Sequence, residues 1–187
     1  MVILPQNINY TKYYGNGGMS STFWGKAFWN ALFTSVLGHY PIKININDLE
    51  HQNILKNYKN LMCSLNVIMP CIFCRISFTQ FFKELPIDNY LVGRIELFYW
   101  IYLMKDKVNK KLIKQEKKCY NNEKKRLKNM YYNKKISYHE YYLKVKEFKI
   151  NTFLTIPTPP FEQVLHKYEK YRAVCDNKAK KCSIILH

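Results

Sequence analysis

Acidic residues are scarce in this sequence, and so are long apolar stretches. Its 187 residues include 13 Asp and Glu against 30 Lys and Arg, which gives a formal net charge of +17 at pH 7. The longest apolar stretches, residues 66–73 and 97–104, fall far short of the roughly 20 residues that a membrane-spanning helix needs. The N-terminus also lacks the basic region and sustained apolar run of a secretory signal. We therefore expect no membrane span and a protein made and kept in the cytoplasm.

Cysteine is sparse as well. Six cysteines in a chain of this length are too few for a disulfide-dense scaffold. The composition, 48% hydrophobic and 23% charged, argues against wholesale disorder. A chain of about 150 residues already buries roughly two-thirds of its unfolded surface. One folded domain with an appendage at one end is the expectation.

Apolar residues recur at helical spacing in five segments, and no period-2 alternation competes with them. The expected helices span residues 20–38, 48–69, 70–85, 89–112 and 161–173. Short connections between the first four are typical of a helical bundle. The sequence thus predicts an all-α fold, a four-helix bundle with an additional helical extension toward the C-terminus.

The positive charge is concentrated in one segment. Residues 105–149 hold 16 Lys and Arg against 5 Asp and Glu, which accounts for +11 of the total. A charge run of this kind favours a long solvated helix-turn-helix face. Tyrosines interleaved with the lysines would also suit nucleic acid, so nucleic-acid binding stays open as an alternative. These tyrosines are Tyr131, Tyr132, Tyr138, Tyr141 and Tyr142.

One short motif carries chemistry: Cys71-Ile72-Phe73-Cys74, directly after Pro70. Proline favours the first turn of a helix, so we expect the pair at a helix N-terminus, where free N–H groups and the helix dipole stabilise a thiolate. Zinc would need a second pair at matching spacing, and the other four cysteines form no C-x-x-C. A thioredoxin-like domain would need strands around the motif. The favoured interpretation is redox chemistry in a helical bundle, with a bound flavin as electron acceptor.

Three blocks of sequence, taken together, resemble the Erv/ALR family of FAD-linked sulfhydryl oxidases. The family opens with W-G-x-x-x-W, and Phe23-Trp24-Gly25-Lys26-Ala27-Phe28-Trp29 is similar to it. The C-x-x-C follows at the expected distance, and residues 99–112 (YWIYLMKDKVNKKL) are similar to the family's Y-W…H-N-x-V-N-x-x-L segment. The resemblance spans residues 23–112, about half the chain. The compact layout is similar to that of members from large cytoplasmic DNA viruses.

The resemblance implies a four-helix core around FAD, usually in a homodimer, that forms disulfides in partner proteins and passes electrons to O₂, giving H₂O₂. Substrate thiols would attack Cys71, while Cys74 would face the flavin. The positions matched to FAD contacts are Trp24, Gly25, Lys26, Trp29, Trp100, Lys105, Val108, Asn109, Lys111 and Tyr138. The chain departs from the family at Lys105-Asp106, which replaces His-Asn, and at Phe33, which replaces a His. Cys119 stands where many members place one cysteine of a structural disulfide, and Ile136 occupies the position of the other.

The resemblance also implies a use for the last two cysteines. Family members often carry a second, mobile cysteine pair on a terminal arm, which relays electrons to the active-site disulfide. Here Cys175 and Cys182 follow the stiff linker 156–160 and lie in a polar tail. Two unpaired thiols on a disordered end are the alternative.

These patterns divide the chain into a flexible lead-in of residues 1–20, an FAD-binding sulfhydryl oxidase domain of residues 21–150, and a linker and tail of residues 151–187. The expected partners are protein dithiols or a thioredoxin-like relay protein. For a viral member the expected location is the host cytoplasm or virus factory, and the virion. The alternative function is a basic nucleic-acid-binding or scaffold protein on an oxidase fold that has lost FAD.

Overall fold

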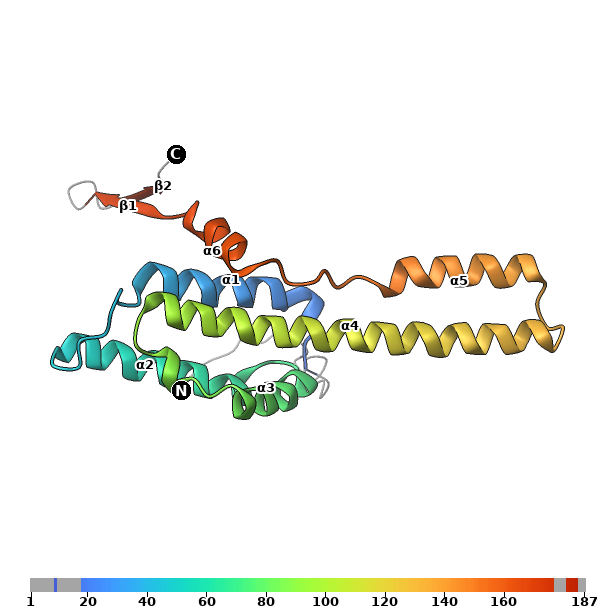
Figure 1. The fold of residues 1–187 in the computed structure, drawn as a ribbon, viewed down its shortest axis with the longest axis horizontal. Helices are drawn as coiled ribbons and strands as arrows, with labels where there is room; N and C mark the ends of the chain where they lie inside the picture. The colour runs from blue at the N-terminus through green and yellow to red at the C-terminus, as the bar shows by residue number, and fades with distance from the viewer. Residues whose placement is uncertain (1–8, 10–17, 177–180, 185–187) are drawn as a thin grey trace.

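The structure is a computed structural model that describes residues 9, 18–176 and 181–184. The predicted N-terminal lead-in therefore lies almost entirely outside the described residues. The remainder is dominated by helices, as Figure 1 shows, and the all-α prediction is confirmed. The α-helices are α1 (Ser21–His39), α2 (Leu49–Ile68), α3 (Ile72–Glu84), α4 (Arg94–Tyr132), α5 (Tyr138–Thr152) and α6 (Phe161–Glu169), with a short 3-10 helix η2 (Asp88–Tyr90) before α4.

The starts of several helices are fixed by local hydrogen bonds. The carboxylate of Asp48 accepts from the N–H groups of Glu50 and His51 and so caps α2. Ser137 and Glu140 form a reciprocal capping box at the start of α5. Both satisfy N–H groups that a helix leaves without intrahelical partners.

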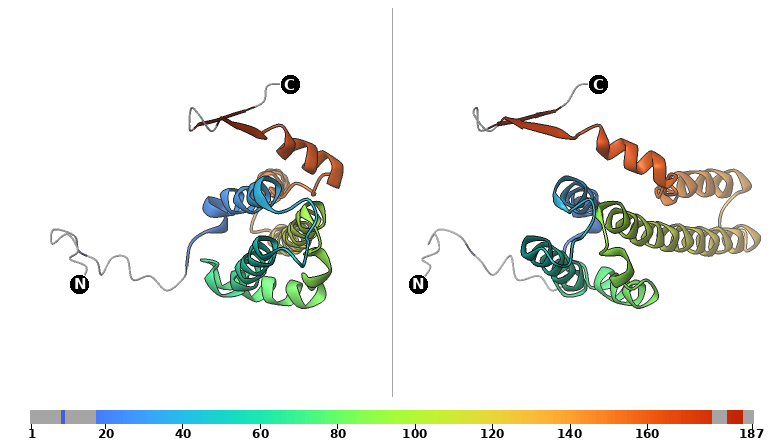
Figure 2. Two further views of the ribbon diagram at one scale, coloured as in Figure 1. Left: turned by 90° about the vertical axis from the view of Figure 1, so that its left-hand side faces the viewer. Right: turned by 60° about the vertical axis from the view of Figure 1, so that its left-hand side comes forward.

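The core lies where α1, α2, α3 and α4 face one another, and the left view of Figure 2 looks nearly along these helices. The rings of Phe33 on α1 and Phe98 on α4 are 4.8 Å apart. The buried hydroxyl of Tyr40 donates to the Leu91 carbonyl at 2.7 Å and ties the end of α1 to the segment before α4. Helix α6 covers the outside of this pair, since the Tyr168 ring stacks on Phe33 and its hydroxyl donates to Asn30. The C-terminal helix thereby becomes part of the core.

Helix α4 runs twenty residues past its predicted end at Leu112. No glycine or proline interrupts residues 113–132, and a second apolar seam (Ile113, Tyr120 and Leu127) begins where the bundle ends. Helix α5 returns antiparallel along this seam, after a turn in which Lys134 adopts a φ of 54°. The helix-turn-helix reading of the basic segment is confirmed, and the predicted end of the fourth helix is wrong.

The C-terminal tail forms a two-stranded antiparallel hairpin. Strand β1 (Ala173–Asp176) pairs with β2 (Lys181–Ile184), and the register sets Cys175 opposite Cys182. Cys175 is disulfide-bonded, so the alternative of two unpaired thiols does not hold for it. The sequence predicts only a polar tail here, because four-residue strands are too short to show an alternating pattern.

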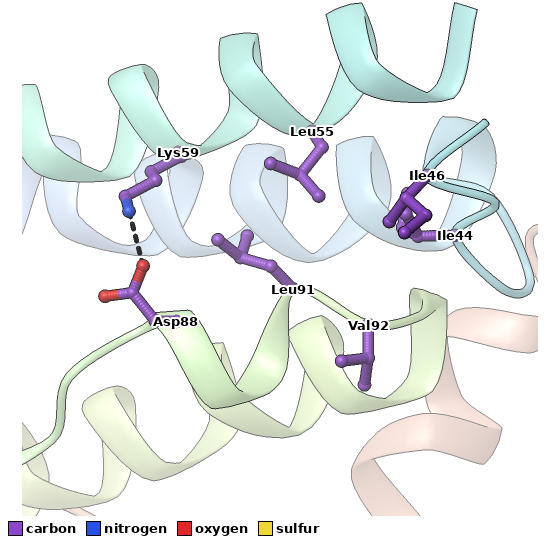
Figure 3. Close-up of a pocket in the computed structure, with 7 residues that line it drawn as sticks. All are labelled: Ile44, Ile46, Leu55, Lys59, Asp88, Leu91 and Val92. Atoms are coloured by element: carbon purple, nitrogen blue, oxygen red, sulfur yellow. Dashed lines mark hydrogen bonds and ion pairs between the residues drawn. The ribbon is translucent and has the colours of Figure 1, made fainter. Parts of the chain in front are cut away.

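A shallow apolar depression of about 290 Å³ lies between α2, the loop that follows α1, and η2 (Figure 3). It is lined by Ile44, Ile46, Leu55, Lys59, Asp88, Leu91 and Val92, and Lys59 pairs with Asp88 across its edge. No cysteine lines it, so it is separate from the C-x-x-C. Among the helices that the structure describes, none is both long enough and apolar enough to cross a bilayer.

Candidate active site

The C-x-x-C lies at the N-terminus of α3, as its position after Pro70 predicts. Cys71 is the N-cap residue, and its Sγ accepts from the backbone N–H of Cys74 at 3.4 Å. Both thiols are free. Cys74 lies one turn further along α3 and packs against the hydrophobic core. The two sulfurs therefore occupy different environments, one at the helix end and one against the bundle interior.

These environments move the two thiol pKa values apart. Burial acts to raise the pKa of Cys71, but hydrogen bonds from the Cys74 thiol and from the N–H groups of Cys74 and Phe73, with the charge of Arg75, outweigh it and lower that pKa. Burial raises the pKa of Cys74 to about 12, and its hydrogen bond to Cys71 and the charge there add to the effect. Lys111 and Arg75 oppose this rise in the pKa of Cys74. In the reduced pair Cys71 therefore ionises at a lower pH than Cys74.

Three residues that the sequence analysis did not single out hold the turn before Cys71. The Arg75 guanidinium donates to the Met69 carbonyl at 2.6 Å. The N–H of Met19 donates to the Pro70 carbonyl at 3.0 Å. Gly18 has a φ of +73°, and a Cβ at this position would lie 1.9 Å from the Pro70 oxygen. Glycine is required at position 18, and nothing in the local pattern around it indicates a contact with a cysteine fifty residues away.

Lys111 connects α4 to the thiol site. Its ammonium group donates to the hydroxyl of Ser77, which lies on α3 one turn beyond Cys74. The positive charge is close enough to Cys74 to favour the thiolate form of that residue. Of the positions matched to the family, Lys111 is thus the one whose charge reaches a cysteine sulfur.

The three tryptophans have different surroundings. Trp24 is half-buried, and its indole N–H donates to the Met19 carbonyl at 3.0 Å. The half-buried Trp29 ring lies 5.8 Å from the Lys105 ammonium. Trp100 is only 1% exposed, packs against Phe82 and donates to the Leu85 carbonyl. Trp24 and Trp29 are half-buried residues of α1, whereas Trp100 is a core residue of α4.

Asn109 contacts the returning linker, whereas the neighbours of Lys105 are Trp29 on α1 and Lys167 on α6. Burial and then the charge of Lys167 lower the pKa of Lys105. The Asn109 amide donates to the Thr158 hydroxyl at 2.9 Å and more weakly to the Ile156 carbonyl at 3.4 Å. Asp106, which stands in the place of the family's Asn, is paired with Lys110 instead.

Tyr138 is not brought to the other predicted cofactor positions. It lies at the far end of α4, with its ring 5.9 Å from Tyr131, and it is 64% exposed. Lys111 and the last residue of α4 are separated by 21 residues, roughly 30 Å of helix. The unanticipated length of α4 is the physical reason that a role for Tyr138 beside the C-x-x-C has no support in the structure.

The remaining matched positions have the character that a dinucleotide requires. Lys105 and Lys111 are half-buried ammonium groups, and within the described residues neither has a carboxylate partner. Val108 is half-buried and Lys26 is exposed. No atom lies within 4 Å of where a Cβ on Gly25 would be, so α1 offers open surface there. Aromatic rings, uncompensated ammonium groups and an open glycine together fit FAD, which presents planar rings and phosphates.

Comparison with known proteins identifies the family of this chain. A family model described as Erv1 / Alr family matches residues 26–128, more than half of the chain. Among solved structures, the crystal structure of the yeast Erv1 core aligns with 58% of this chain and 84% of its own, at 23% identity and a TM-score of 0.40. A search of curated proteins finds no match. On the strength of the family match, this chain belongs to the Erv1/Alr family, a family of sulfhydryl oxidases.

Proposed function

We propose that this protein is an FAD-dependent thiol oxidase that forms disulfides in partner proteins. One observation carries the proposal: a free C-x-x-C pair at a helix N-terminus, in which the pKa of Cys71 is lowered and Cys74 is half-buried near the charge of Lys111. In its disulfide form such a pair can be attacked by a substrate thiolate at Cys71 and can pass the electrons on from Cys74. O₂ is the proposed final acceptor, with H₂O₂ as its product.

The exchange begins with the pair oxidised to a disulfide. A substrate thiolate attacks Cys71 Sγ, a substrate–Cys71 bond forms, and Cys74 leaves as a thiolate. The ammonium group of Lys111, whose charge already favours ionised Cys74, stabilises that leaving group. A second substrate thiolate then attacks the substrate sulfur of the mixed disulfide and releases Cys71. The substrate is oxidised by two electrons, and the Cys71–Cys74 pair is reduced by two.

FAD, when bound, supplies the two-electron acceptor that returns the pair to its disulfide form and is itself reoxidised by O₂. The residues that would hold it are Trp24, Trp29, Lys105, Val108 and Lys111. Cys74, rather than Cys71, packs toward the interior that these residues share with α3.

The visible spectrum of the purified protein tests the proposal. Flavin absorbance near about 450 nm, at about one FAD per chain, would support it, together with O₂ consumption on addition of dithiothreitol. Cys71→Ser and Cys74→Ser should each abolish O₂ consumption, whereas Cys63→Ser, at an exposed cysteine on α2, should leave it unchanged. A protein that stays colourless with added FAD would refute the oxidase and favour the scaffold reading.

The roles of the two cysteines can be separated with an aromatic disulfide reagent on the reduced protein. In a Cys63→Ser/Cys119→Ser/Cys175→Ser/Cys182→Ser background, the intact pair should release two equivalents of thiol, because Cys74 displaces the first adduct on Cys71. Cys74→Ser should release one equivalent and leave a stable adduct on Cys71. A stable adduct in the Cys71→Ser protein, formed at the faster rate, would reverse the assignment.

We also propose that Cys175 and Cys182 form an electron shuttle. Arg172, three residues before Cys175, donates to the Leu37 carbonyl near the C-terminal end of α1, whereas Met19, just before the start of α1, contacts Pro70. These two contacts are separated by roughly 25 Å along the helix. The hairpin therefore serves a second copy of the chain or moves away from α1 before it reaches Cys71.

The double variant Cys175→Ser/Cys182→Ser tests the shuttle. Oxidation of a reduced protein substrate should slow, and oxidation of dithiothreitol should stay near wild type, because the small thiol reaches Cys71 directly. Equal rates for wild type and variant on both substrates would remove the role. The homodimer that the shuttle would exploit is checked by sedimentation of the wild-type protein.

The resemblance to the family also suggests the source of this protein and its location in the cell. We propose a viral-type member that acts in the host cytoplasm, on protein dithiols or a thioredoxin-like relay protein. Its oxidase domain would span residues 21–150, which includes the residues matched by the family model. Detection of the protein in cytoplasmic fractions and virions would test this location.

A further inference from the structure

Residues 113–152 form a helical arm that the oxidase chemistry does not use. The arm consists of the second half of α4 and the whole of α5, and it projects beyond the ends of α1, α2 and α3 (Figure 1). The family match ends at residue 128, so the tip of the arm and α5 lie outside it. Nothing in the thiol site requires this projection.

One face of the arm is explained by its own packing. Residues of α4 at alternating spacings of three and four turn toward α5, and the buried Leu127 is among them. Three of the four acidic residues of the arm already have hydrogen-bond or ion-pair partners in the arm or the adjoining linker. Glu123 pairs with Arg126, Glu116 accepts from Thr155, and Glu140 caps α5 at Ser137.

A stripe of exposed lysines runs along α4 beside the seam with α5. The lysines fall within an arc of about 120° when 3.6 residues make one turn, and that arc begins next to Ile113 and extends away from α5 toward the opposite side of the helix. Its members are Lys114, Lys117, Lys118, Lys124, Lys125 and Lys128, all exposed. Across the arm, 12 Lys and Arg stand against 4 Glu. Within the described residues, its one ion pair is Arg126–Glu123, so the lysine charge is uncompensated.

The tip of the arm carries a cluster of aromatic rings. Tyr131 lies 5.6 Å from Tyr132, 5.9 Å from Tyr138 and 6.0 Å from Tyr141. Tyr132 and Tyr138 are each 64% exposed, far more than packing of the turn would require. The ammonium group of Lys128 lies 5.4 Å from the Tyr132 ring, so the lysine stripe runs directly into the cluster.

We infer that the arm binds single-stranded nucleic acid. Lysine is a compact point charge suited to phosphate, and a row of lysines tracks a nucleic-acid backbone. Exposed rings at the end of that row provide faces on which unpaired bases stack. An acidic protein partner would complement the charge of the lysine stripe, but binding of such a partner would not explain why the tyrosine rings are exposed. The proposal is independent of the oxidase, because it involves neither FAD nor a thiol.

The test is fluorescence anisotropy of the full-length protein with labelled oligothymidylate and oligouridylate of about 20 nucleotides, long enough for one binding groove. If about six phosphates are contacted, log K should fall with log salt at a slope of about −4. Lys117→Gln/Lys124→Gln/Lys128→Gln should lower the magnitude of this slope by about 2. The matched control, Lys43→Gln/Lys56→Gln/Lys83→Gln, removes the same charge from exposed positions on the bundle and should bind as wild type.

A tip variant separates stacking from charge. Tyr132→Leu/Tyr138→Leu should weaken binding by about fivefold or more per ring, with the salt slope unchanged. Wild-type affinity in this variant would overturn the proposal, as would no binding at about 50 mM salt, or equal losses in the arm and control lysine variants. Competition by polyglutamate as effective as that by unlabelled oligonucleotide would also overturn it, and would assign the arm to an acidic protein instead. Circular dichroism checks that each variant is folded.

Discussion

The separation of the two thiol pKa values predicts that the reduced pair reacts with electrophiles almost entirely at Cys71. At pH 8, a thiol with a pKa of about 12 is ionised in about one molecule in 10⁴, against about one in ten for the ordinary value of 9.0. Cys74 should therefore be alkylated about a thousandfold more slowly than an ordinary thiol, since the thiolate is the nucleophile. Cys71, whose pKa is lowered, should reach its full rate at a lower pH than an ordinary thiol.

Iodoacetamide labelling of the reduced protein, followed by peptide mass spectrometry, measures both rates. The exposed thiols Cys63 and Cys119 are internal references. Shielding alone would slow Cys74 equally at every pH, so the decisive measurement is the slope. Between pH 8 and pH 10 the rate at Cys74 should rise about tenfold per pH unit without a plateau. A plateau for Cys74 in that range, or faster labelling of Cys74 than of Cys71, would refute the assignment of the thiolate.

Lys111, which lies near the pair, provides a second test of the same prediction. Lys111→Met removes a charge that lowers the pKa of Cys74, so Cys74 should ionise at still higher pH. The matched control is Lys114→Met, an exposed lysine one turn further along α4. If both variants shift the labelling profile of Cys74 equally, the effect of Lys111 on the pKa of Cys74 is that of a long-range charge and does not depend on its position beside Ser77.

Three further predictions concern the surroundings of the pair. Trp100→Phe removes two buried ring carbons at about 0.8 kcal/mol each and one hydrogen bond worth about 1 kcal/mol, so urea unfolding should show a loss of roughly 2–3 kcal/mol. Trp24→Phe, at a half-buried position on α1, should cost less, and the reverse order would refute the assignment of Trp100 as the more tightly packed of the two. Gly18→Ala should displace residues 18–19 from Pro70 and raise the alkylation rate of Cys71 at high pH; an unchanged rate would show that this contact shields nothing. Asn109→Ala should release the linker and speed its cleavage by chymotrypsin after Phe153 and Leu154, whereas unchanged cleavage would mean that Thr158 is held by other contacts.

Much of the fold could be predicted from local patterns in the sequence. Helix α2 was predicted within one residue at each end because Asp48 provides a cap and Pro70 provides a stop. The place of Cys71 at the start of α3 follows from the same proline. These features depend on residues a few positions apart, and such signals can be read without knowledge of the tertiary structure.

The parts that could not be predicted depend on distant contacts. Lys111 was matched to a family position, but its contact with Ser77 exists only because α3 and α4 cross at that turn. The contact of Gly18 with Pro70 joins residues that no local pattern relates. The placement of Tyr138 failed for a different reason. Tyr138 was matched to a late aromatic position of the family, and the continuous helix α4 places it far from the C-x-x-C.

Helix α4 explains how one element serves two surfaces. Up to about Lys111 its inner face is a wall of the bundle, where Trp100, Ile101 and Met104 are buried. Beyond that point the bundle ends, and only α5 covers the helix, so a single seam is buried and the rest is free to carry charge. A helix of this length keeps both ends in fixed relation, since its backbone hydrogen bonds leave no hinge. Whatever the lysine stripe binds is therefore held at a set distance from the turn of α4 that contacts Ser77, beside Cys74.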